Sequence, residues 1–258
     1  MPNLTTNQLL NLALKTFAPN SGGPEQHLIE ASLLSIVNLP IQMNWLNEAI
    51  GQLPIAQDEW SQDISAACSS ELADIFKRYG SDKSSYHDYH KCYGKLLMDR
   101  RDAELTVVEI GIGSTNPAMM SNMGTGGTPG ASLRAFEAYL PKATLIGADI
   151  DRSIFFETER IQCVYCNQME EDGFIDLERA LSHRTIDLFI DDGLHALSAN
   201  LNSLKFALDH TTKGSAIVIE DIHQNVAPIW SVIASSLSHK FNCQLLNCLN
   251  GYVFVLQK

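Results

Sequence analysis

Residues 105–114 read LTVVEIGIGS, and this stretch indicates the class of fold. Leu105 to Ile110 form a short, nearly continuous apolar run, which is the pattern of a β-strand buried on both faces of a sheet. Gly111 and Gly113 follow at once, where a chain leaving such a strand must turn sharply and approach a ligand without an intervening Cβ. The stretch therefore predicts the first strand of an open α/β sheet, with a ligand site where the strand ends.

From this strand onward, apolar strand-like runs alternate with helical patterns. The expected strands after the first one are residues 143–150, 161–166, 186–192 and 215–222, and the expected helices are residues 132–140, 197–210 and 226–239. Such βαβ alternation predicts an α/β domain with a doubly wound, Rossmann-like, mostly parallel sheet.

The C-terminal stretch departs from this alternation. Residues 241–257 place Asn250-Gly251 between two strand-like runs, which is the strongest short signal for a β-hairpin. We therefore expect a seven-stranded sheet that ends in an antiparallel hairpin, the topology of class I S-adenosylmethionine (SAM) methyltransferases. Purely parallel dinucleotide-binding folds lack this hairpin.

Composition and charge exclude several kinds of partner. The chain has 258 residues, with 18 basic and 30 acidic side chains and a net charge of −12. No stripe of Lys or Arg provides the footprint that a nucleic acid needs. The N-terminus lacks the pattern of a signal peptide, and no apolar run approaches the length of about 18 residues that a membrane span needs. These features predict a cytoplasmic protein with no nucleic-acid or membrane partner.

The N-terminal part has a different character from the rest. Its first 65 residues are mostly apolar and helical in pattern, with a break at residues 18–26, and they carry no recognisable chemistry. A further helix is expected over residues 69–80, ending at Gly80. We therefore predict a helical cap or oligomerisation segment over residues 1–70, through which a homo-oligomer could form, and a catalytic domain over residues 71–258.

The six cysteines are scattered along the chain. Cys163 and Cys166 form a C-x-x-C pattern, but they lie in an expected strand, where a separation of three residues places the two thiols on opposite faces. No second Cys/His pair follows at zinc spacing. We therefore expect reduced thiols rather than a metal or redox site.

Two features at the first strands concern the cofactor. Position 116 is Asn, so the third glycine of a dinucleotide motif is absent, whereas SAM has no phosphate and its cationic sulfonium suits an acidic neighbour such as Glu109. Asp149 is expected at the tip of the second strand, where a carboxylate can accept hydrogen bonds from both ribose hydroxyl groups. A solvated strand-end acid or a helix N-cap is the alternative for Asp149. The long loop of residues 114–132, rich in Gly and Met, is expected to be a lid or pocket wall, or else disordered filler.

Acids and a histidine follow the fourth and fifth strands. Asp191, Asp192 and His195 come after the fourth strand, and Glu220 and Asp221 close the fifth. Because parallel strands deliver their carboxyl ends to one rim, Asp192 and Asp221 can converge on one point, where their repulsion favours Mg²⁺. Mn²⁺ or Fe²⁺ competes if an imidazole also ligates. His195 could act as a general base on a substrate hydroxyl, and the alternatives are an N-cap for Asp191 and a helix-start histidine for His195.

In combination, these stretches resemble a known family. From about Leu72 to the C-terminus the chain resembles the metal-dependent sugar O-methyltransferases that tailor macrolide antibiotics, and the methyltransferase domains of polyketide synthases. The matching stretches are YGSDKSSYHDYHKCY, VVEIGIGS, SNMG, PGASLRAFEAYLPKATLIGADID, ERIQCVYCNQ, IDLFIDDGLH and IVIEDIH. One departure is Asn167, where the family commonly has an acid before Gln168; Gln168 itself remains and could be a ligand or a hydrogen-bond donor.

The resemblance implies a set of site residues. The predicted cofactor-binding residues are Tyr79, Lys83, Glu109, Gly111, Gly113, Asp149 and Asp191. Asp192 and Asp221 are the predicted metal ligands and His195 the predicted base, and the segment from Tyr79 to His90 is expected to close over the cofactor.

The resemblance favours SAM- and metal-dependent O-methylation of a small natural product or sugar. C-methylation of a carrier-protein-bound acyl group and a non-catalytic binding subunit stay open as alternatives, and a dinucleotide-dependent oxidoreductase is a more distant one.

Overall fold

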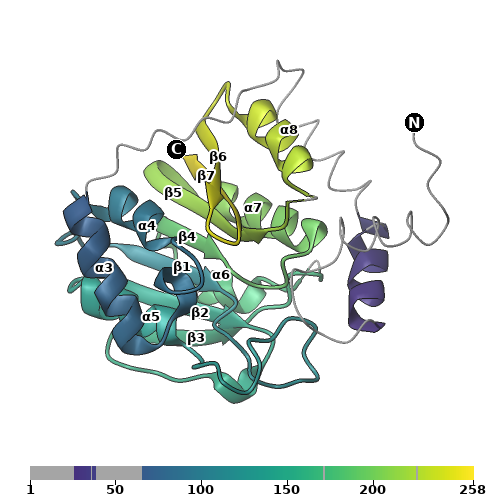
Figure 1. Ribbon diagram of the computed structural model, residues 1–258, viewed down its shortest axis with the longest axis horizontal. Coiled ribbons are helices and arrows are strands. Elements are labelled where there is room, and N and C mark those ends of the chain that lie inside the picture. The colour runs from purple at the N-terminus through teal and green to yellow at the C-terminus, as the bar shows by residue number, and fades with distance from the viewer. Residues whose placement is uncertain (1–25, 36, 39–65, 171, 225) are drawn as a thin grey trace.

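The computed structural model describes residues 26–35, 37–38, 66–170, 172–224 and 226–258 (Figure 1). Within these residues the strands form one seven-stranded sheet of order β3-β2-β1-β4-β5-β7-β6. The strands are β1 (Thr106–Ile110), β2 (Thr144–Asp149), β3 (Ile161–Tyr165), β4 (Ile186–Asp191), β5 (Thr211–Ile222), β6 (Asn242–Cys248) and β7 (Gly251–Gln257). Strands β1 to β5 pair in parallel, and β7 pairs antiparallel with β5 and with β6. The predicted mostly parallel sheet with a terminal antiparallel hairpin is confirmed.

Helices cover both faces of this sheet, as the ribbon drawing shows (Figure 1). One face packs against α3 (Ala66–Tyr79), α4 (His90–Leu97) and α5 (Ala131–Tyr139). The other face packs against α6 (Ile175–Leu181), α7 (Leu197–His210) and α8 (Ala227–Leu237). Two 3₁₀ helices, η1 (Asp82–Ser84) and η2 (Arg152–Ile154), lie in connections. Because every central strand is covered on both sides, its residues are apolar at nearly every position.

The alternation of side chains along the strands decides which way each buried acid points. In β1, Val108 and Ile110 belong to the core under α6 to α8, whereas Val107 belongs to the core under α3 to α5. Glu109 is two residues from Val107 and shares its face. The same alternation sends Glu220 of β5 toward α4 and Asp191 of β4 toward α7. Three buried acids near one rim are thereby divided between two faces of the sheet.

Two element boundaries differ slightly from the sequence-based expectation. Helix α3 begins at Ala66 rather than near residue 69, and it ends at Tyr79 with Gly80 in the left-handed conformation (φ 80°) that often follows a helix. In the hairpin, Cys248 pairs with Gly251, so the loop is Leu249 and Asn250, one residue earlier than expected. Asn250 has a positive φ of 61°, which asparagine tolerates well.

Most of the predicted N-terminal segment, residues 1–70, lies outside the described residues, so its role as a cap or oligomerisation segment stays a prediction. Residues 26–35 and 37–38 within it are helical. The thiols of Cys92, Cys163, Cys166, Cys243 and Cys248 are unpaired. No helix in the described part of the chain is long and apolar enough to cross a membrane.

The packing between the sheet and α3 to α5 predicts a large cost for truncating Phe136. Its ring is fully buried and contacts Phe76 and Tyr93 edge-on, with both pairs of ring centres 5.2 Å apart. Phe136→Ala should lower the free energy of unfolding in urea by about 3–5 kcal/mol, because it removes apolar burial and leaves a cavity. Val232→Ala, at a position that is 57% exposed on α8, should change it by less than about 0.5 kcal/mol. Equal effects of the two substitutions would contradict the packing described here.

Candidate active site

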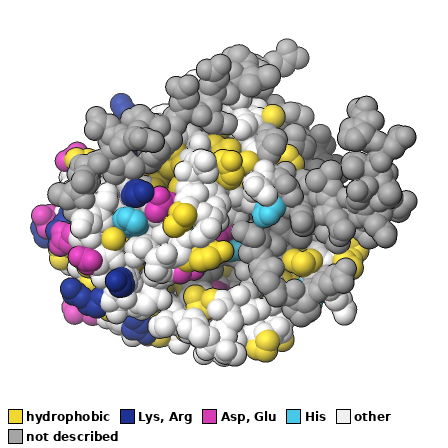
Figure 2. Space-filling view, viewed as in Figure 1, with side chains coloured by type: hydrophobic (Ala, Val, Ile, Leu, Met, Phe, Trp, Pro, Cys, Tyr) yellow, Lys and Arg dark blue, Asp and Glu magenta, His cyan; other side chains and the backbone are white. Residues whose placement is uncertain are grey.

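A cavity of about 730 Å³ opens at the carboxyl ends of the central strands. Gly111, Gly113 and Asp149 line it, together with Asp192, His195 and Asp221. On the face of the molecule shown in Figure 2, hydrophobic, acidic and histidine side chains gather near the middle. One hollow therefore joins the ends of four neighbouring strands, β2, β1, β4 and β5.

The turn after β1 is bound tightly to Asp149. One carboxylate oxygen of Asp149 accepts a hydrogen bond from the backbone N–H of Ile112 at 2.9 Å, and the other accepts one from Asp151 at 2.9 Å. Gly111 and Gly113 have φ values of 83° and 88°, and a Cβ on Gly111 would collide with the carbonyl of Asp192. Glycine is therefore required where the ends of β1 and β4 approach each other.

The long loop after this turn forms a wall of the cavity. Met119, Met120 and Met123 line the cavity, and the N–H of Met123 donates to the carbonyl of Ser114 at 2.9 Å. Within the described residues the loop is thus folded back over the glycine turn. The predicted lid or pocket wall fits this position better than disordered filler does.

Three side chains that line the same cavity could hold a metal ion. Asp192, His195 and Asp221 each place one ligand atom so that all three atoms lie within 4.8 Å of one another. The Nε2 atom of His195 is 3.8 Å from Asp192 Oδ1 and 3.7 Å from Asp221 Oδ2. The two acids are 25% and 18% exposed, so the cavity reaches them. Two carboxylates and an imidazole suit a divalent cation such as Mg²⁺, Mn²⁺ or Fe²⁺.

A buried lysine balances the acids beside this trio. The ammonium of Lys83 lies 2.7 Å from Asp192 Oδ2 and 3.4 Å from Glu109 Oε1, and it forms a short ion pair with Glu220. Burial alone would lower the pKa of Lys83, but the three carboxylates outweigh it and hold that pKa above its usual value. Burial raises the pKa of Glu109 to about 7, against the opposing effect of Lys83. Lys83 therefore neutralises part of a dense negative charge.

Asp221 has its own set of partners. The Tyr89 hydroxyl donates to Asp221 Oδ1 at 2.5 Å, and His87 Nε2 lies 3.3 Å from the same oxygen. Burial tends to raise the pKa of Asp221, but His195, His87 and the Tyr89 hydrogen bond together lower it below its ordinary value. The carboxylate form of Asp221 is therefore favoured.

The backbone is strained at two of the three possible ligands. His195 and Asp221 have φ values of 57° and 54°, a region that side chains other than glycine rarely occupy. A bulge in the pairing of β5 with β7, between Ile219 and Ile222, contains Asp221. Such bulges re-aim side chains, and here the bulge lets Glu220 and Asp221 serve different partners.

The structure brings most of the predicted site residues to the cavity and places three elsewhere. Lys83, Gly111, Gly113, Asp149, Asp192, His195 and Asp221 line the cavity. Tyr79 ends α3 and packs against the core, and Glu109 lies buried behind the wall, where Ser132 donates to it at 2.8 Å. Asp191 is fully buried and accepts hydrogen bonds from Gln168 at 2.7 Å and Asn200 at 3.0 Å. Direct cofactor contact by these three residues stays a prediction, and their described partners fit a supporting position.

Sequence reasoning did not assign roles to three further residues near the acids. His87 and Tyr89 contact Asp221, and Tyr93 donates to Glu220. The density of His and Tyr in residues 86–93 was the available signal. Those residues are brought to the acids by tertiary folding, so the sequence alone could not pair them.

Comparison with known proteins places the chain near sugar methyltransferases. No protein-family model matches the chain. It is 30% identical over 158 residues to the 8-demethyl-8-alpha-L-rhamnosyl tetracenomycin-C 2'-O-methyltransferase of Streptomyces olivaceus, which is 61% of this chain and 39% of the relative. It is 26% identical over 179 residues to the mycinamicin VI 2''-O-methyltransferase of Micromonospora griseorubida, which is 68% of this chain and 42% of the relative.

The fold has solved counterparts. The MycE methyltransferase of the mycinamycin pathway, in complex with Mg, SAH and mycinamycin VI, superimposes with a TM-score of 0.56 at 23% identity. The match covers 72% of this chain and 54% of MycE. The chain thus has a class I methyltransferase fold, and the resemblance to macrolide-sugar O-methyltransferases is confirmed. The matched regions span less than half the length of the two curated relatives.

Because the backbone at His195 is strained, we expect a glycine variant at this position to be at least as stable as an alanine variant. At an ordinary position, glycine is less stable than alanine by about 0.5–1 kcal/mol. In the left-handed region a residue with a Cβ pays about 1–2 kcal/mol that glycine does not. The free energy of unfolding of His195→Gly, measured by urea titration, should therefore equal that of His195→Ala or exceed it by up to about 1.5 kcal/mol. A glycine variant clearly less stable than the alanine variant would show that the backbone is relaxed there.

Proposed function

We propose that this protein is a SAM-dependent methyltransferase that uses a divalent metal to methylate a hydroxyl group, on a sugar or another part of a small natural product. One observation carries the proposal: a single cavity joins the glycine turn and Asp149 to the trio Asp192, His195 and Asp221. A methyl donor on one side and a hydroxyl on the other could meet in that cavity.

The cofactor side suits SAM by its chemistry. The backbone at Gly111 and Gly113 can approach an adenosyl ligand closely, and Asp149 stands where ribose hydroxyl groups would be bound. The acids around the cavity favour a cationic sulfonium. The MycE structure, which shares this fold, contains SAH.

The metal side rests on Asp192 and Asp221, each of which turns one carboxylate oxygen toward His195. A divalent cation held there supplies Lewis acidity, which lowers the pKa of an acceptor hydroxyl. Mg²⁺ is the first choice for a site dominated by carboxylates, and the MycE complex contains Mg.

His195 is the proposed general base. Its Nε2 lies 3.8 Å from Asp192 Oδ1 and 3.7 Å from Asp221 Oδ2, and His195 lines the cavity, where the imidazole could take the proton of an acceptor hydroxyl. Its Nδ1 is buried without a hydrogen-bond partner among the described residues. Because the same Nε2 could instead ligate the metal, the two roles are separated by measurement below.

The acceptor is proposed to be a glycosylated natural product. The two relatives described above are named for O-methylation of a rhamnosyl tetracenomycin and of mycinamicin VI. The methionines of the loop wall give an adaptable apolar surface, which suits a large hydrophobic body attached to a sugar.

Calorimetric titration tests the cofactor first. The full-length protein should bind SAM, or SAH, and show no heat with NAD, because the turn lacks the third glycine of a dinucleotide site. An absence of SAM binding would remove the enzymatic proposal and favour a non-catalytic methyltransferase-fold subunit.

Substitution of the trio tests the metal and the base. Asp192→Asn should abolish stoichiometric Mn²⁺ binding while SAM affinity stays within about threefold, since it removes one negative charge from the site but leaves the cofactor side intact. As the control, Asp187→Asn removes an acid from the opposite end of β4, where Arg100 holds it at 2.6 Å, and should retain Mn²⁺. Full metal content in Asp192→Asn would refute the proposed ligand.

His195→Ala should lower turnover by about 10²–10⁴-fold with metal content and SAM affinity retained, if His195 is the base. Formation of SAH from SAM in the presence of mycinamicin VI or rhamnosyl tetracenomycin measures turnover. Loss of Mn²⁺ binding in His195→Ala would assign His195 to the metal instead, and unchanged turnover would exclude both roles.

A further inference from the structure

In each of the two acids of the possible metal site, the two carboxylate oxygens have different partners. Asp192 accepts from Lys83 through Oδ2 and turns Oδ1 toward His195. Asp221 accepts from Tyr89 through Oδ1 and turns Oδ2 toward His195. In each acid, one oxygen accepts a hydrogen bond from Lys83 or Tyr89, and the other faces the point that a cation would occupy.

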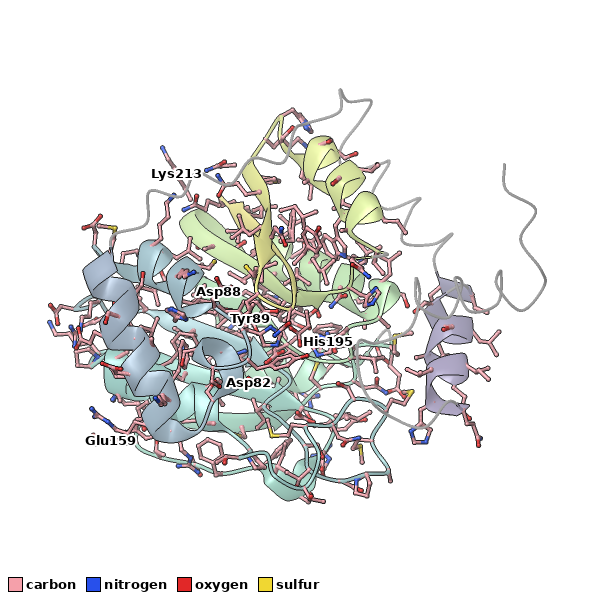
Figure 3. The ribbon with its side chains drawn as sticks, viewed as in Figure 1. Asp82, Asp88, Tyr89, Glu159, His195 and Lys213 are labelled. Carbon is pink, nitrogen blue, oxygen red and sulfur yellow. The ribbon has the colours of Figure 1, made fainter. Side chains whose placement is uncertain are left out.

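The donors to these two acids, Lys83 and Tyr89, both come from one short segment, residues 81–89. This segment also lines the cavity at Ser81, Asp82 and His87. The Tyr89 hydroxyl donates to Asp221 Oδ1, and the His87 ring stacks on the Tyr89 ring with centres 4.3 Å apart. Figure 3 shows Tyr89 and His195 reaching the same central region from different elements.

The segment is fixed in place by the turn of the terminal hairpin. Asp88 accepts from the N–H of Leu249 at 2.7 Å, Asn250 donates to the carbonyl of Tyr86 at 2.7 Å, and His87 Nδ1 lies 3.1 Å from the carbonyl of Leu249. Since a carbonyl can only accept, Nδ1 of His87 carries the proton of this bond. The orientation of the His87 ring is therefore set by the hairpin.

We propose that Tyr89 is a positioning residue of the metal site, which holds Oδ1 of Asp221 so that Oδ2 is presented to the cation. His87 supports it by stacking on the Tyr89 ring. The inference rests on the proposed function, since it concerns the same metal. Partners of this kind fix the direction of a ligand, and their loss typically lowers metal affinity by about 10–100-fold.

The neighbouring pair of Tyr93 and Glu220 provides an internal comparison. Tyr93 donates to Glu220 Oε1 in a short hydrogen bond, and Lys83 engages Oε2. Both oxygens of Glu220 are thus held by the protein, and its side chain is 1% exposed. Glu220 lies outside the trio of possible ligands in the described part of the chain. Tyr89 and Tyr93 therefore make the same kind of bond to consecutive acids, only one of which faces the cation point.

The experiment compares Tyr89→Phe with Tyr93→Phe in the full-length protein. Each substitution removes one buried hydroxyl that donates to a carboxylate. Mn²⁺ affinity is measured by calorimetry, and the absorption spectrum of bound Co²⁺ reports the geometry of the ligands. Tyr89→Phe should weaken Mn²⁺ binding by about 10–100-fold and alter the Co²⁺ spectrum. Tyr93→Phe should leave the Mn²⁺ affinity within about threefold of that of the unsubstituted protein. It should also leave the Co²⁺ spectrum unchanged.

Thermal unfolding with a chelator controls for stability, because a merely structural role would lower the melting temperature without separating the two variants in Mn²⁺ affinity. Should Tyr89→Phe fold poorly, His87→Asn removes the ring that stacks on Tyr89 and should weaken Mn²⁺ binding in the same direction.

The outcomes separate the two proposals. If the unsubstituted protein binds no Mn²⁺, the metal-dependent function fails. If it binds Mn²⁺ but Tyr89→Phe keeps full affinity, or Tyr93→Phe weakens binding equally, the positioning role of Tyr89 is wrong. If only Tyr93→Phe weakens Mn²⁺ binding, the metal ligand is Glu220 rather than Asp221.

Discussion

The buried ammonium group of Lys83 is the interaction on which the rest of this site depends. It lies among Glu109, Asp192 and Glu220, three acids that would otherwise repel one another at one edge of the sheet. A charge buried without a partner is costly, so one fixed cation allows several acids to converge at the rim of the sheet. The negative charge that remains, on Asp192 and Asp221, faces the cavity. The same electrostatic arrangement thus lowers the free-energy cost of burying these acids and leaves the cavity with an affinity for cations.

The parallel sheet explains why these acids come together at all. Strands β1, β4 and β5 end at the same edge, so acids separated by more than a hundred residues along the chain become neighbours there. The alternation of the strand then sorts them: Asp191 turns to Gln168 and Asn200, while Asp192 turns to the cavity. The bulge and left-handed backbone at Asp221 provide a further change of direction. Strain of this kind persists only where the surrounding structure holds it.

Residues 81–89 link the two halves of the site. They line the cavity that the proposed cofactor would enter, and they contact both acids that would hold the metal. Because the hairpin turn at Leu249 and Asn250 anchors this segment, the antiparallel end of the sheet has a direct connection to the site. The terminal hairpin is therefore part of the architecture of the site as well as a marker of the fold.

The sequence by itself determined the alternation of strands and helices, the terminal hairpin and the residues that end each strand, because hydrophobic period and turn residues are local properties. It also placed Asp149, Asp192, His195 and Asp221 correctly at one rim, since the ends of parallel strands share an edge. Only the tertiary structure decided that Glu109 and Asp191 lie behind the cavity wall, that Tyr79 packs against the core and that Tyr89 reaches an acid of the site. Those outcomes depend on which side chain a distant segment brings to a given oxygen, and no pattern within a single stretch of sequence encodes that pairing.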